Sequence, residues 1–237
     1  MGEQVKLKKA LLAIALLVGV VAAQAVTAKA DSIYSGSDGT LFATADFNLT
    51  GSTLTITLTN TSGADVLVRT DVLTGVFFNT TGALTPVSAS LNGSSVFYGS
   101  TTNPGDGWGY ASGVRAHGEN SAISAAGHVN RLGHSNFSGA SNALGGLGYG
   151  ILSAGFTLDS GQNGGVTRHG PLIQDSVQFT LTAPSGFSLS ERGSSVISQY
   201  GTSLSDTDYA GKLDAVPESG TLFILGSGLA WLVGWRW

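Results

Sequence analysis

The sequence predicts an all-β body, an antiparallel β-sandwich of the jelly-roll or Ig-like type with long Gly-rich loops. Short segments in which apolar and polar residues alternate recur between residues 31 and 200, and turns rich in Gly, Asn and Pro separate them. An apolar segment at each end of the chain adds an expected N-terminal signal helix and a C-terminal apolar helix. The chain has no cysteine, so burial and hydrogen bonds alone must hold the body together.

The clearest alternation lies in residues 41–58. Apolar residues at every second position of 41–49 face one side, and Leu54, Ile56 and Leu58 repeat the pattern against a row of threonines. A turn that contains Gly51 separates the two runs. This pattern predicts a β-hairpin.

The remaining elements of the body are less regular. Further strands are expected, in chain order, at 66–72, 75–78, 87–91, 95–98, 172–173, 176–182, 187–191 and 196–200. Asn92-Gly93 is the residue pair of a type I′ turn, which predicts a hairpin across it. Residues 104–170 are dense in glycine and should be mostly loops, with a short helix at 121–128 and a strand at 149–158. Residues 201–215 are expected to be a polar linker.

Residues 1–30 have the features of a secretory signal peptide. Three lysines precede an apolar run at 10–23, and the small residues Ala28 and Ala30 complete a small-x-small cleavage site. We expect cleavage after Ala30, with cleavage after Ala25 as the alternative. The body should therefore be exported.

The C-terminal segment combines a short polar motif with an apolar run. Val216, Pro217 and Glu218 come first, and the apolar residues 222–235 follow. These 14 residues are fewer than the ~20 that a helix needs to cross a ~30 Å hydrocarbon core. A segment this short is expected to act as a temporary anchor of the precursor.

Residues 216–237 resemble the PEP-CTERM sorting signal of exported bacterial proteins. The resemblance rests on the Val216-Pro217-Glu218 motif, the apolar Leu-Gly-Ser-Gly-Leu-Ala core at 225–230 and the final Arg236. Ser219 stands where the family has a second proline, and the family usually ends in several arginines. The resemblance implies recognition and removal of the tail by exosortase, a membrane-embedded transpeptidase-like enzyme. It also implies transient membrane contact through the C-terminal helix, delivery to the cell surface or extracellular matrix, and exopolysaccharide as a candidate partner.

The charge of the body excludes two classes of partner. Six basic and thirteen acidic residues between positions 31 and 215 give a formal net charge of −7. Nucleic acids and anionic lipid surfaces both require clustered Lys and Arg, so neither is expected. A structural or adhesive surface role without a cofactor is the first functional hypothesis. A secreted carbohydrate-binding module is the alternative, and a secreted hydrolase is the third.

Trp108 and Tyr110 are the candidate glycan-binding residues, because exposed aromatic rings among glycines can stack on sugar rings. The competing interpretation is a strand whose Trp108 enters the core. The four histidines are the candidates for a hydrolase site or a metal. Their spacing matches no compact zinc pattern, so no metal site is predicted.

Overall fold

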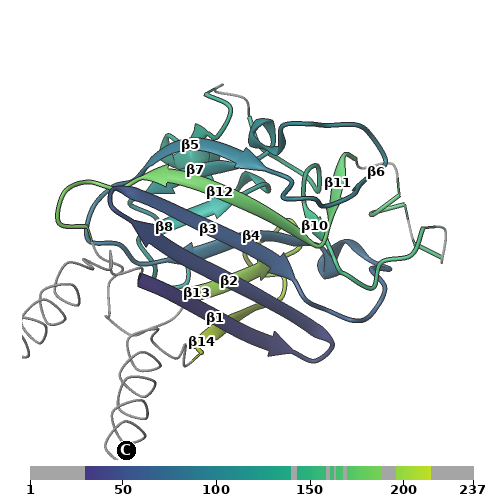
Figure 1. Cartoon of the computed structure of the whole chain (residues 1–237). Helices are drawn as coiled ribbons and strands as arrows, with labels where there is room; N and C mark the ends of the chain where they lie inside the picture. The colour runs from purple at the N-terminus through teal and green to yellow at the C-terminus, as the bar shows by residue number, and fades with distance from the viewer. Residues whose placement is uncertain are drawn as a thin grey trace, which may run out of the picture.

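The computed structural model describes residues 30–139, 143–158, 161–162, 164–167, 170–187 and 196–214 of the chain. Within these ranges the body is all-β, with fourteen strands in one large, nearly barrel-shaped sheet and three short 3-10 helices (Figure 1). The all-β prediction is confirmed. The predicted C-terminal helix, the sorting motif and all of the signal segment but Ala30 lie outside the described residues. No helix in the described ranges has the length and apolar character needed to cross a membrane.

One layer of the body consists of long antiparallel strands. In sheet order it contains β5 (Thr85–Ser90), β12 (Ser176–Thr182), β3 (Thr53–Asn60), β2 (Leu41–Thr50) and β1 (Ala30–Asp38). β2 and β3 form the predicted hairpin, with Thr50 opposite Thr53. Their side chains alternate between buried and partly exposed, as the period of two requires.

The other layer is built from shorter strands and carries the loops. It contains β4 (Leu73–Phe78), β6 (Val96–Phe97), β7 (Gly109–Ser112), β8 (Ser121–Ser124), β9 (Ser135–Asn136), β10 (Ile151–Leu152), β11 (Leu172–Gln174) and β13 (Val196–Tyr200). Three 3-10 helices lie in the connections, η1 (Arg69–Asp71), η2 (Pro104–Asp106) and η3 (Gly127–Leu132). β10 and β11 pair in parallel, and the other recorded pairings are antiparallel.

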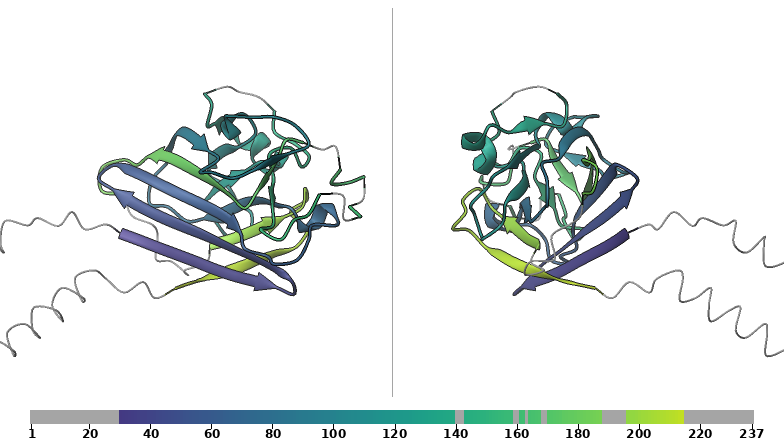
Figure 2. Two further views of the ribbon diagram at one scale, coloured as in Figure 1. Left: turned by 45° about the vertical axis from the view of Figure 1, so that its right-hand side comes forward. Right: turned by 90° about the vertical axis from the view of Figure 1, so that its left-hand side faces the viewer.

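Strand β14 (Asp208–Leu213) joins the two layers. It pairs with β1 on one side and with β13 on the other, so the hydrogen-bonded ladder continues from the first layer into the second. The sheet curls, and its two halves face one another across the core (Figure 2). Phe47 of β2 and Phe78 of β4 meet there with ring centroids 5.3 Å apart. A single curled sheet thus takes the place of two separate sheets.

Several predicted elements are wrong. The linker predicted at 201–215 is wrong over its described residues 201–214, because β14 occupies 208–213 and the Asp214 N–H still donates to the Ile33 carbonyl (2.8 Å). Residues 66–72 hold η1 instead of a strand, and 121–124 form β8 instead of the start of a helix. Tertiary pairing overrides weak local preferences in these segments.

At Asn92-Gly93 the predicted turn conformation is present, but the predicted hairpin is not. Both residues have positive φ, 49° and 86°, as a type I′ turn requires. The strands on either side do not pair with each other, since β5 pairs with β12 and β6 pairs with β11. The turn therefore connects the two opposite ends of the sheet order.

Candidate functional site

Trp108 and Tyr110 are not available for glycan stacking. Their exposed fractions are 0% and 4%. The Trp108 ring packs against Phe179, with centroids 5.0 Å apart, and its Nε1 donates to the Tyr149 carbonyl (2.9 Å). The Tyr110 hydroxyl accepts a hydrogen bond from the Leu84 N–H (3.2 Å). The glycan-binding assignment of these two residues is therefore wrong, and the competing core interpretation of Trp108 fits.

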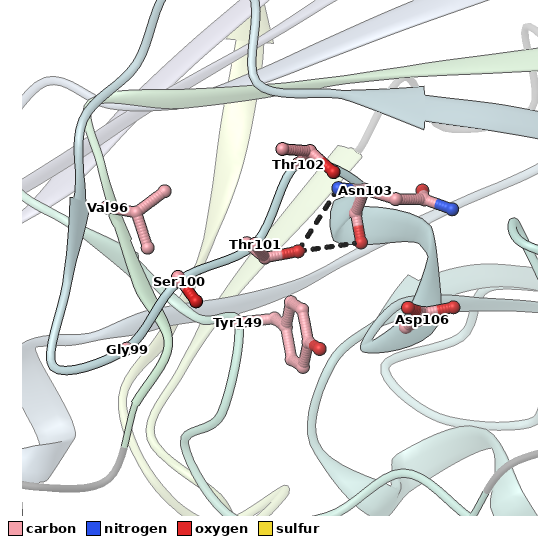
Figure 3. Close-up of a pocket in the computed structure, with 8 residues that line it drawn as sticks. All are labelled: Val96, Gly99, Ser100, Thr101, Thr102, Asn103, Asp106 and Tyr149. Carbon is pink, nitrogen blue, oxygen red and sulfur yellow. Dashed lines mark hydrogen bonds between the residues drawn. The ribbon is translucent and has the colours of Figure 1, made fainter.

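An open pocket of about 530 Å³ lies beside the segment that holds Trp108. It is formed by β6, the loop that follows it, η2 and the turn before β10 (Figure 3). Its lining residues are mostly polar and include one aromatic ring: Val96, Gly99, Ser100, Thr101, Thr102, Asn103, Asp106 and Tyr149. The pocket thus combines hydroxyl, amide and carboxylate groups with an aromatic surface.

The polar side of the pocket is a loop that stabilises itself. The Thr101 hydroxyl accepts from the Asn103 N–H (3.1 Å) and donates to the Asn103 carbonyl (3.0 Å), as the dashed lines in Figure 3 show. The Asn103 side-chain oxygen then accepts from the Gly105 N–H (3.0 Å) and caps η2. These local bonds fix the position of Asp106, whose carboxylate has no hydrogen-bond partner among the described residues.

Tyr149 provides the aromatic side of the pocket. Its backbone is held on both sides, because its N–H donates to the Pro171 carbonyl and its carbonyl accepts from Trp108. It has a positive φ of 66°, a backbone conformation that is uncommon for residues other than glycine. Such outliers concentrate where the surrounding structure fixes them, often at binding sites.

Gly107 determines where the Tyr149 ring lies. A Cβ at position 107 would overlap Cγ and Cδ2 of the ring and lie 2.6 Å from the Tyr149 Cβ. Only glycine lets the ring rest on the backbone there. One side of the ring is thus covered, and the rest of this partly exposed residue borders the pocket. The predicted ligand-binding residues were Trp108 and Tyr110, whereas the aromatic ring that lines the pocket is that of Tyr149.

Three of the four histidines, His117, His128 and His134, lie within the described residues. His117 and His128 both pack near Phe77, with ring centroids 4.9 Å and 6.3 Å from it. His134 lies against Gly109, and His169 lies outside the described residues. The described residues contain no group of three or more His, Cys, Asp or Glu residues that could hold a metal ion.

The surroundings of His117 determine its tautomer. The buried Gln199 donates through Nε2 to backbone carbonyls, including those of Tyr200 (2.8 Å) and Ser203 (3.1 Å), so its Oε1 is an acceptor. His117 Nε2, 3.0 Å from that oxygen, must therefore carry the proton. Its Nδ1 lies 3.7 Å from an Asp208 carboxylate oxygen. In a Ser-His-Asp triad Nε2 is the base that accepts the nucleophile's proton, and here that nitrogen is already a donor to Gln199.

Burial is the main influence on the pKa of His128. Burial lowers the pKa of His128 below its ordinary value of 6.5, the positive charge of His117 lowers it further, and Asp206 partly opposes them. Its buried Nε2 has no hydrogen-bond partner among the described residues. The Asp206 carboxylate itself accepts from the Thr202 and Ser203 N–H groups, both at 2.9 Å. The Asp206 carboxylate therefore closes the turn that precedes β14.

Comparison with known proteins adds no relative that could assign these features. No protein-family model, no curated protein and no solved structure matches this chain.

Proposed function

We propose that this chain is an exported bacterial surface or extracellular-matrix protein that exosortase processes, and that its body has a structural and adhesive role without enzymatic activity. The signal-like residues 1–30 and the PEP-CTERM-like residues 216–237 support the export route. The described body lies between them, because β1 begins at Ala30 and Asp214, the last described residue, is hydrogen-bonded to Ile33 of that strand.

The observation that carries the adhesive role is that the pocket and the two ends of the body lie on opposite sides of the molecule. β1 and β14 are neighbours in the sheet, and β1 begins and β14 ends on the same side of the molecule, on the left of Figure 1. β6, which contributes Val96 to the pocket, lies on the right in Figure 1. A body held through its C-terminal end would present the pocket away from its attachment.

The absence of enzymatic activity is part of the same proposal. In the His117–Asp208 pair, which resembles part of a catalytic triad, the Nε2 of His117 is engaged by Gln199. The finer fold assignment, a jelly-roll or Ig-like sandwich, is also proposed, on the support of two facing layers that pack through Phe47 and Phe78. A solved structure with an up-and-down barrel order would contradict that assignment.

Mapping the termini of the protein in cell fractions tests the export route. In a strain with exosortase, surface-associated protein should contain no peptide beyond about Glu218, and its first residue should be Asp31. In a strain without the enzyme, membrane fractions should retain Trp237. Pro217→Ala should have the same effect as loss of the enzyme, whereas Ser219→Ala serves as the matched control. An intact Trp237 on surface-associated protein in the presence of exosortase would refute the proposal.

A further inference from the structure

The pocket beside Tyr149 has the chemistry that recognition of a sugar ring requires. A pyranose presents hydroxyls that donate and accept hydrogen bonds, and it also presents a face of C–H groups. Ser100, Thr102 and Asp106 line the pocket with side chains that make no hydrogen bond to a described residue. The Tyr149 ring supplies an apolar surface next to them, on which C–H groups can pack.

We propose that this pocket binds a neutral saccharide, with one sugar ring packed on Tyr149 and its hydroxyls bound by Asp106 and the 100–103 loop. The carboxylate of Asp106 can accept from two adjacent hydroxyls. In Figure 3 the Tyr149 ring extends from the turn toward η2, with its hydroxyl on the Asp106 side and the 99–103 loop beside the ring. A ring lying on Tyr149 would thus reach both polar elements.

The loop and the aromatic ring of the pocket are preorganised in the absence of a ligand. Thr101 and Asn103 hold the loop through their own hydrogen bonds, and Gly107 and the two backbone bonds of Tyr149 hold the aromatic ring. The loop backbone and the Tyr149 ring therefore have little freedom left to lose on binding, which favours affinity for a small ligand. The volume of about 530 Å³ also falls within the range of about 300–1,000 Å³ that is usual for small-molecule pockets.

Charge selects the class of saccharide. Asp106 is the one charged residue among the eight that line the pocket, and the body as a whole carries a formal charge of −7. Uronic acids and sulfated sugars would place a negative charge beside an unpaired carboxylate. A neutral hexose or N-acetylhexosamine meets no such repulsion, so the site should select neutral glycans and reject anionic ones.

The proposal deepens the adhesive function proposed above and takes its biological setting from it, but binding can be measured on purified protein. Titration calorimetry of the full chain would use hexasaccharides of glucose, mannose, galactose and N-acetylglucosamine, with hexamannuronate as the anionic probe. We expect at least one neutral probe to bind and hexamannuronate not to bind. Binding of no neutral probe, or preference for hexamannuronate, would overturn the proposal.

Variants assign the binding to this pocket. Tyr149→Leu removes the ring and should weaken binding at least about tenfold, whereas Tyr149→Phe keeps the ring and should stay within about threefold. Asp106→Asn should also weaken binding while it preserves the shape of the loop. Phe42→Ala removes an exposed aromatic ring (43% exposed) on β2 outside the pocket, so it is the matched control.

A blocking variant covers the case in which Tyr149→Leu unfolds. Thr102 is exposed and makes no hydrogen bond to a described residue, so Thr102→Trp fills the pocket from its rim and leaves the core intact. Loss of binding in folded Thr102→Trp supports the site, and unchanged binding in it overturns the site. Failure of the export proposal has a different signature, because it alters the mapped termini and leaves the calorimetry unchanged.

Discussion

Replacing Gly107 with Ala should reveal how tightly the Tyr149 ring is held. Gly107 has φ −104° and ψ 0°, so Ala adopts its backbone without left-handed strain. At such a position Gly→Ala would stabilise a protein by about 0.4–1 kcal/mol through the unfolded chain. Here the new Cβ would lie 2.6 Å from the Tyr149 Cβ and overlap the ring, whereas ordinary contact begins at 3.4 Å.

The overlap decides the sign of the effect. The side chain of Tyr149 must retreat by about 0.8 Å (3.4 − 2.6) at its Cβ, and overpacking of this kind costs about 1–3 kcal/mol. The net expectation for Gly107→Ala is a loss of about 1–2 kcal/mol in the free energy of unfolding. In a Tyr149→Gly background the obstacle is gone, and glycine also accepts the φ of 66°. The same Gly107→Ala change should then stabilise by about 0.4–1 kcal/mol.

Urea unfolding measures the four proteins of this double-mutant cycle. Trp108 is the one tryptophan between residues 31 and 215, and it is fully buried, so its fluorescence reports on the loss of the core. The coupling energy between positions 107 and 149 should be about 1–3 kcal/mol. Gly63→Ala is the matched control, since a Cβ there meets nothing within 4 Å. An equal effect of Gly107→Ala in both backgrounds would show that the contact with the ring is not what requires glycine.

Three further predictions concern protonation, a buried hydrogen bond and processing. Because burial lowers the pKa of His128, the folded protein should lose stability as the pH falls below 6.5, and His128→Asn should flatten the urea midpoints measured against pH. Burial raises the pKa of Tyr200 to about 12, so stability should fall as the pH rises from 10 toward 12. Tyr200→Phe should reduce this alkaline loss of stability. At neutral pH the same variant should lose about 1–3 kcal/mol in the free energy of unfolding, because the Tyr209 hydroxyl loses its acceptor. An unchanged urea midpoint at neutral pH would refute the second expectation. Pro217 follows Asp214, whose N–H is bonded to Ile33 of the body, by three positions in the sequence, so the body should hinder exosortase at the motif. A flexible linker inserted between Asp214 and Pro217 should therefore speed tail removal in pulse-chase experiments, and slower removal would contradict this expectation.

Local sequence patterns account for some elements and mislead on others. The hairpin of β2 and β3 was predictable because its period of two runs unbroken through both strands. β14 was missed because its two buried positions hold Tyr209 and Gly211, and acidic residues flank them. Tyr209 also requires Gly36 across the neighbouring strand, since a Cβ at position 36 would lie 2.8 Å from its Cδ2. That complementarity joins residues 173 positions apart and leaves no local signal.

The sequence by itself determined the resemblance to an export and sorting route, the all-β class, and the absence of disulfides, because these depend on composition and short-range patterns. Only the tertiary structure decided which aromatic residue is available to a ligand. Trp108 and Tyr149 both stand among glycines, but Phe179, 71 positions away, covers the first, whereas the second borders an open pocket. The burial of a ring depends on neighbours that long-range strand pairing supplies, and no local pattern encodes them.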